Sequence, residues 1–139
     1  MPKKNFADVK KIIIFATDKI CQFILSQYNE VRNFVMMMNV HVFENICRLK
    51  RQLLPNDRMI LFGSQARGDA RPDSDWDLLL LLNKAKKEET DEDKAFEFVM
   101  MGWEYGTYMS IKIYTNEQWE KRKFSPFYEN VVNEGIEII

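Results

Sequence analysis

The sequence predicts one small domain of the mixed α/β (α+β) class, in which a small mixed sheet is flanked by helices and preceded by a helical extension. Three observations predict it. A length of 139 residues suits a single compact core. Apolar residues recur at helical spacing over the first third of the chain. Beyond that, short apolar runs typical of buried strands alternate with helical segments.

The N-terminal third contains two helical patterns. Apolar residues between positions 9 and 35 predict one long or two short amphipathic helices. A further helix is predicted from Val42 to Leu54, where Pro55 ends it. We therefore expect a helical extension over residues 1–40 and the main domain over residues 41–139.

Four segments predict strands. Met59–Phe62 is a short apolar run, and Trp76–Leu82 is apolar on both faces after its first residues. Tyr108–Tyr114 alternates between apolar and polar residues, and Ile136–Ile139 is a short apolar run at the end of the chain.

Three helices are predicted between these strands. Residues 64–68 predict a short helix or turn. A longer helix is expected to begin with a capping arrangement of Thr90 and Asp93 and to run to about Tyr105. Residues 125–134 predict the last helix, because a proline stands at its start and a glycine just after its end.

Composition and charge argue against several classes of protein and favour one cellular location. A net charge of -1 argues against a protein that coats nucleic acid, since such proteins carry an excess of basic residues. Cys21 and Cys47 form no paired motif, which favours a reduced protein. The apolar run at residues 12–16 is too short for a membrane span, which needs ~20 residues. We expect a soluble, cytoplasmic protein that does not contact a membrane.

The first chemical motif is a predicted phosphate site after the first strand. Gly63 has no side chain, so a ligand can approach its backbone closely. The N–H groups that follow it are free at the start of a helix or turn and attract anions. Ser64 adds a hydroxyl donor and Arg67 a guanidinium group.

The second motif is a pair of carboxylates at the start of the second strand. Asp75 and Asp77 are two residues apart, so their side chains face the same way in a strand. Two adjacent carboxylates repel each other unless a cation lies between them. Mg²⁺ prefers a few carboxylates together with water and substrate phosphates. Next to a phosphate site, this pair predicts a nucleoside triphosphate as ligand, although either motif alone is more often a turn or a solvated loop end.

The two motifs together resemble a known family. Gly63-Ser64, ten intervening residues and Asp75-x-Asp77 resemble the signature of the nucleotidyltransferase superfamily that includes DNA polymerase beta. The longer stretches at residues 61–68 and 74–78 are similar to its small prokaryotic branch, the minimal nucleotidyltransferases. The resemblance runs from about Val42 to the C-terminus and is more specific at the centre than in the tail.

The resemblance implies a fold, a reaction and a partner. It implies that residues 41–139 form a nucleotidyltransferase domain in which Gly63 and Ser64 hold the triphosphate and Asp75 and Asp77 are the catalytic, Mg²⁺-binding residues. The implied activity is transfer of a nucleotidyl group, often AMP from ATP, to an acceptor hydroxyl. Several members of this branch are antitoxins that pair with an all-helical toxin of the HEPN type and silence it by modifying a tyrosine.

The sequence departs from this family in the strand at residues 108–114. The family has a third carboxylate there, which helps to hold the metal and activates the acceptor. Here Ser110 is expected at that position, and a hydroxyl is a poorer Mg²⁺ ligand and base. Glu104 replaces it only if the chain bends to bring it in. Nucleotide and metal binding are therefore better supported than turnover.

Three hypotheses follow. The first is a magnesium-dependent nucleotidyltransferase that acts on a partner protein. The second is an antitoxin-like binding module with a vestigial nucleotide site, which neutralises a HEPN-type partner by contact. The third, a transferase that modifies RNA or an antibiotic, is weakest, because the chain is short and has no strongly basic surface.

Overall fold

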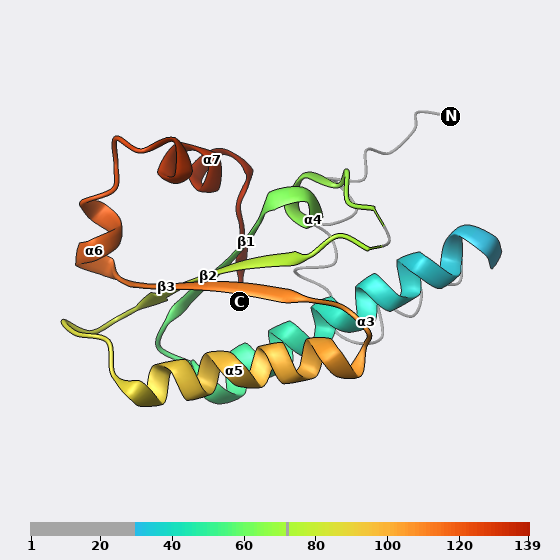
Figure 1. Cartoon of the computed structure of the whole chain (residues 1–139), viewed down its shortest axis with the longest axis horizontal. Helices are drawn as coiled ribbons and strands as arrows, with labels where there is room; N and C mark the ends of the chain where they lie inside the picture. The colour runs from blue at the N-terminus through green and yellow to red at the C-terminus, as the bar shows by residue number, and fades with distance from the viewer. Residues whose placement is uncertain (1–29, 72) are drawn as a thin grey trace.

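A computed structural model describes residues 30–71 and 73–139, and their side chains from residue 39 onward. The predicted helical pattern of residues 9–29 and Cys21 lie outside the described residues. The described chain confirms the predicted fold class: it forms a four-stranded mixed sheet with helices on both faces (Figure 1).

The sheet has the strand order β3-β2-β1-β4. The strands are β1 (Arg58–Phe62), β2 (Trp76–Leu82), β3 (Met109–Thr115) and β4 (Ile136–Ile138). β1 pairs antiparallel with both β2 and β4, whereas β2 and β3 are parallel. The parallel pair needs a crossover, which α5 (Glu89–Glu104) supplies.

Alternation along the strands divides the core into two layers. One layer packs against α3 (Glu30–Leu53) and α5, and contains Leu78, Leu80 and Phe98. The opposite layer lies under α6 (Asn116–Glu120) and α7 (Pro126–Glu134), where Leu79 and Leu81 meet Trp119. Figure 1 shows α3 and α5 on one side of the sheet and α6 and α7 on the other. β2 is buried on both faces, as its continuous apolar run predicts.

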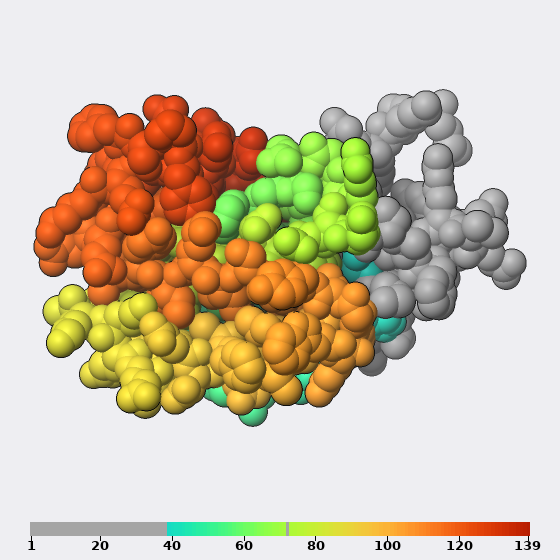
Figure 2. All heavy atoms as spheres, viewed as in Figure 1, coloured from blue at the N-terminus to red at the C-terminus, as the bar shows by residue number. Residues whose placement is uncertain are grey.

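β3 is an edge strand. Its outer edge lies on the face of the molecule shown in Figure 2, with α5 on one side and α6 and α7 on the other. Along β3, only the two end residues, Met109 and Thr115, are buried; Lys112 is exposed, and the other residues are half-buried. The strand that neighbours β2 can therefore present side chains to a ligand.

Two predicted helix starts are wrong. The helix expected from Val42 is continuous from Glu30, so α3 runs without a break through residues 40 and 41. α5 is capped by Glu88 and Asp91, whose side chains exchange hydrogen bonds with each other's backbone, and not by Thr90 with Asp93. Asp91 is fully buried and also accepts a hydrogen bond from Lys84 at 2.8 Å, which favours this start.

Helix α6 was not predicted. It is only five residues long, but Thr115 caps it by accepting a hydrogen bond from the backbone N–H of Gln118. Its one buried side chain, Trp119, packs on α7 at 4.8 Å between its ring centroid and that of Tyr128. No helix among the described residues is long and apolar enough to cross a membrane.

Candidate functional site

The turn after β1 depends on Gly63. Its φ of +73° lies in the left-handed region, which strains any residue with a Cβ. A Cβ at this position would also collide with Oδ2 of Asp77. Gly63 therefore permits two things at once: the chain turns sharply from β1 into α4 (Gly63–Arg67), and the Asp77 carboxylate packs directly against the backbone of that turn.

Helix α4 is short and ends at Gly68, whose φ of 87° is also left-handed and whose N–H donates to the Ser64 carbonyl at 3.0 Å. Five residues give only a small helix dipole, so the free backbone N–H groups and the half-buried Ser64 carry most of the expected attraction for phosphate. No side chain caps the start of α4. Its first N–H groups therefore have no side-chain acceptor among the described residues.

Asp77 is the second residue of β2 and lies half-buried on the α6/α7 face of the sheet. Asp75 lies just before the strand and is exposed. Burial raises the pKa of Asp77, and the negative charge of Asp75 raises it further, against smaller opposing effects of Lys112 and Arg67. The two carboxylates are thus close enough to repel each other.

This pair of carboxylates suits a divalent cation whose remaining ligands do not come from protein side chains. The described residues contain no group of three or more carboxylate, cysteine or histidine side chains able to hold a metal. Mg²⁺ commonly binds through one or two carboxylates and completes its shell with water and substrate phosphates. The residues present fit Mg²⁺ on that basis, with the Gly63-Ser64 turn beside it for the phosphates.

Arg67 was expected to offer its guanidinium to a phosphate, but in the structure it is paired with two carboxylates. Its Nε contacts Asp69 at 3.3 Å and its Nη1 contacts Glu134 of α7 at 3.0 Å. These two carboxylates, Glu134 first, raise the pKa of the Arg67 guanidinium. In this structure Arg67 therefore ties α4 to α7, and it must exchange at least one of these partners to bind a phosphate.

Gln65 has a positioning role that the sequence did not reveal. Its side chain is 5% exposed, and its Nε2 donates to the backbone carbonyl of Ser74 at 3.4 Å. The Ser74 hydroxyl in turn accepts from the backbone N–H of Arg71 at 2.8 Å. These contacts fix the loop that leads into the two carboxylates. A polar residue between Gly63 and Arg67 was the only available signal.

β3 completes the site on the other side of β2. Ser110 is the register partner of Asp77, and Lys112 follows two residues later on the same face. Ser110 therefore lies beside Asp77, on the strand where the third carboxylate was expected. Glu104 is the exposed last residue of α5 and lies outside β3.

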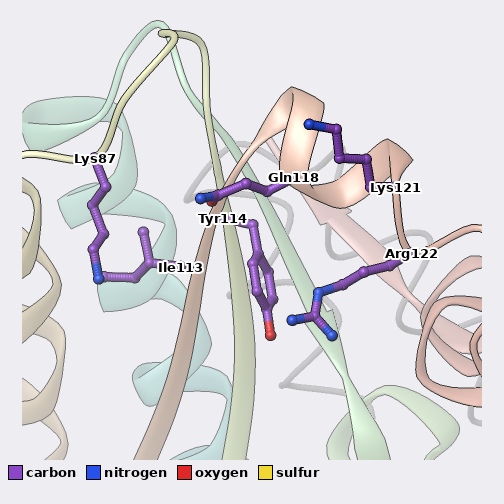
Figure 3. A pocket seen from close by; sticks show the side chains of 6 residues that line it. All are labelled: Lys87, Ile113, Tyr114, Gln118, Lys121 and Arg122. Carbon is purple, nitrogen blue, oxygen red and sulfur yellow. The ribbon is translucent and has the colours of Figure 1, made fainter.

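A hollow of about 380 Å³ lies at the far end of β3, between that strand and α6. Figure 3 shows Tyr114 and Ile113 from β3, and Gln118, Lys121 and Arg122 from α6 and the turn after it. The Arg122 guanidinium lies 4.4 Å from the centroid of the Tyr114 ring. This hollow is four residues along β3 from Ser110, so it is adjacent to the carboxylate site and not part of it.

The fold and site define a class of protein. A glycine-serine turn after β1 and two carboxylates at the start of its antiparallel neighbour β2 are the arrangement expected of a nucleotidyltransferase domain. A family model described as a nucleotidyltransferase domain matches residues 43–137. The chain therefore belongs to this family, within the DNA polymerase beta superfamily. No curated protein matches the chain.

Membership implies a general activity. The family transfers nucleotidyl groups and typically uses a nucleoside triphosphate with a divalent metal. It identifies the chain as a member of a transferase family without specifying the acceptor.

Proposed function

We propose that the protein is a magnesium-dependent nucleotidyltransferase that transfers AMP from ATP to an acceptor hydroxyl on a partner protein. The observation that carries this proposal is the packing of the Asp77 carboxylate against the Gly63 turn, beside Asp75. Carboxylates and a phosphate-binding turn in contact with each other suit a metal-bound triphosphate better than either ligand alone.

Each residue has a proposed role. Asp75 and Asp77 hold Mg²⁺, which when bound supplies positive charge to the triphosphate. The backbone of Gly63 and the hydroxyl of Ser64 bind the phosphates, and Arg67 joins them when it leaves Asp69 or Glu134. Gln65 holds the loop that positions the carboxylates.

Among the described residues, this mechanism has no evident general base to remove the proton from the acceptor hydroxyl. A general base must lie within hydrogen-bond reach of the hydroxyl that it activates, and its pKa must suit the task. Ser110, the residue beside Asp77, is neutral and is a poor base. We therefore expect slow transfer, unless the acceptor protein itself supplies the base.

The proposal is tested by binding before turnover. We would titrate the protein with ATP by calorimetry, with and without Mg²⁺, beside the Asp77→Ala variant. The proposal expects binding that depends on Mg²⁺ and is lost in the variant. Absence of binding with ATP, GTP, CTP and UTP would refute it. Transfer of label from ATP to a candidate partner then tests catalysis, with the double variant Asp75→Ala, Asp77→Ala as the control.

A second function is favoured by one observation: the residue that pairs with Asp77 on β3 is Ser110 and not an acid. On this alternative, the protein is an antitoxin-like module that neutralises a HEPN-type partner by contact and keeps a vestigial nucleotide site. The two functions differ in one measurement. Neutralisation of a partner that survives the double Asp75→Ala, Asp77→Ala substitution supports contact, whereas its loss supports modification.

A further inference from the structure

Lys112 brings a positive charge to the face of the sheet that carries Asp77. It lies on β3 two residues beyond Ser110, the register partner of Asp77, and alternation places both side chains on the α6/α7 face. Its Nζ lies 5.9 Å from the centroid of the Phe127 ring of α7, so the ammonium group stays close to the sheet. The side chain is exposed.

The charge of Lys112 is not matched by an anion. Within residues 39–71 and 73–139, Lys112 forms no ion pair, whereas Arg67 is shared between Asp69 and Glu134. The carboxylates of Asp75 and Asp77 are also without a cationic partner in direct contact in that part of the chain. Lys112 pairs with Leu79, two residues beyond Asp77 on β2, so Lys112 and Asp77 are diagonal neighbours on the same face of the sheet.

Lys112 has no anionic partner and the nearby carboxylates have no cationic partner in the described part of the chain. A ligand that carries both positive and negative charge would satisfy both. A divalent metal on a polyphosphate is such a ligand: the metal faces the carboxylates and the phosphate oxygens face the ammonium. Lysine binds phosphate well as a point charge on a flexible stem. Arg67, the cation of the neighbouring helix α4, is already paired with Asp69 and Glu134.

We propose that Lys112 binds phosphate oxygens of the metal-bound triphosphate, as a positioning residue on the strand that lacks the third carboxylate. The inference rests on the proposed function, because it uses the same ligand. It adds a residue from β3 to a site otherwise built from β1, α4 and β2. A purely structural role is the alternative: a lysine on an edge strand also discourages pairing with other sheets.

The test is calorimetric titration of the full chain with ATP and with AMP in Mg²⁺, using Lys112→Ala and Lys112→Arg. The matched control is Lys86→Ala, which removes an exposed lysine beyond the opposite end of β2. We expect Lys112→Ala to raise the Kd for ATP about tenfold or more, because a charged hydrogen bond is lost. Arginine should restore most of the affinity, and the Kd for AMP should change by less than about twofold, since AMP carries a single phosphate.

The outcomes separate this inference from the proposed function. If wild type binds ATP with Mg²⁺ and Asp77→Ala does not, the metal and nucleotide site stands. An unchanged Kd in Lys112→Ala, or an equal loss in Lys86→Ala, then overturns the role of Lys112 alone. If wild type binds no nucleotide, both are overturned. A structural role predicts a lower melting temperature or aggregation in Lys112→Ala with ATP affinity preserved, which also overturns the proposal.

Discussion

β2 and β3 are parallel neighbours that face the same site, yet they differ in both burial and chemistry. β2 is buried along almost its whole length and carries Asp77 where its apolar run begins. β3 is an edge strand of partial burial, and its residues nearest Asp77 on the same face are Ser110 and Lys112. Asp77 thus lies on the most buried strand of the sheet, with Asp75 just before it, whereas the opposite side of the site lies on an edge strand.

The difference indicates which half of the proposed reaction the fold is better suited to. A rigid strand keeps like charges near each other even though they repel, which is the condition a metal relieves. A neutral hydroxyl and an ammonium on β3 suit binding of phosphate better than removal of a proton from an acceptor. Substitutions on each strand can break or sharpen this contrast.

The largest effect is expected from Asp77→Asn. The substitution keeps the shape of the side chain but removes the charge that we propose holds Mg²⁺, so the affinity for ATP in Mg²⁺ should fall at least about a hundredfold. The variant should remain folded, because the native carboxylate is repelled by Asp75 and partly desolvated. Calorimetry together with thermal unfolding checks both statements. If the Asn variant binds ATP as tightly as the wild type, Asp77 has no part in nucleotide binding.

Gly63→Ala should be the most destabilising of these changes. Left-handed φ costs a residue with a Cβ about 1–2 kcal/mol, and displacing the Asp77 side chain adds roughly 1 kcal/mol more. Gly106→Ala is the matched control: Gly106 also has positive φ, at +65°, but a Cβ added there would meet nothing within 4 Å. Denaturant unfolding of both variants isolates the cost of the collision. Equal losses would show that Asp77 moves aside freely.

Ser110→Asp should move β3 towards the chemistry of β2. A carboxylate beside Asp77 adds a metal ligand and a base, so transfer to an acceptor should rise about tenfold and Mg²⁺ should bind more tightly. Without metal, the third negative charge should lower the melting temperature, and Mg²⁺ with ATP should restore it. Ala85→Asp, in the exposed loop after β2, is the control that adds a charge away from the site. A Ser110→Asp variant with no gain in metal affinity would show that β3 lies too far from the metal.

The sequence predicted the parts of this contrast that depend on local pattern. The glycine-serine turn, the paired aspartates and all four strands were predicted, because strand periodicity and turn chemistry are local properties. Ser110 was placed near the expected third carboxylate by the resemblance and not by a local pattern, and the register shows that it is the neighbour of Asp77. Cap residues and short helices were harder to predict. Asp91 and not Asp93 caps α5, because Asp91 is buried and accepts a hydrogen bond from Lys84.

The partners of the charged side chains could not be predicted. Arg67 looked available for phosphate, but Glu134 reaches it from the other end of the main domain. Gln65 carried no sequence signal of its hydrogen bond to the loop at Ser74. Lys112 was hidden for the same reason, since its significance depends on lying beside β2 and on the absence of an acid paired with it in the described chain. Contacts between distant residues decide each of these cases.

The smallest expected effect is a pH dependence of stability that originates on β2. The pKa of Asp77 is raised in the folded protein by burial and by Asp75, so folding favours its protonated form. Its contribution to stability is therefore fully present below the unfolded pKa and is lost as the pH rises through the higher folded value. Wild type should lose stability relative to Asp77→Asn over that interval, by less than about 1 kcal/mol, because the group is only partly buried. Denaturant unfolding of both proteins between pH 3 and pH 7, roughly the range in which carboxyl groups titrate, measures the difference.

Mg²⁺ with ATP should reverse the sign of this stability difference at neutral pH, because the metal then favours the charged form that Asn cannot provide. A difference that is flat with pH and unaffected by Mg²⁺ would mean that the two carboxylates neither feel each other nor share a cation, and the contrast between β2 and β3 would lose its electrostatic basis.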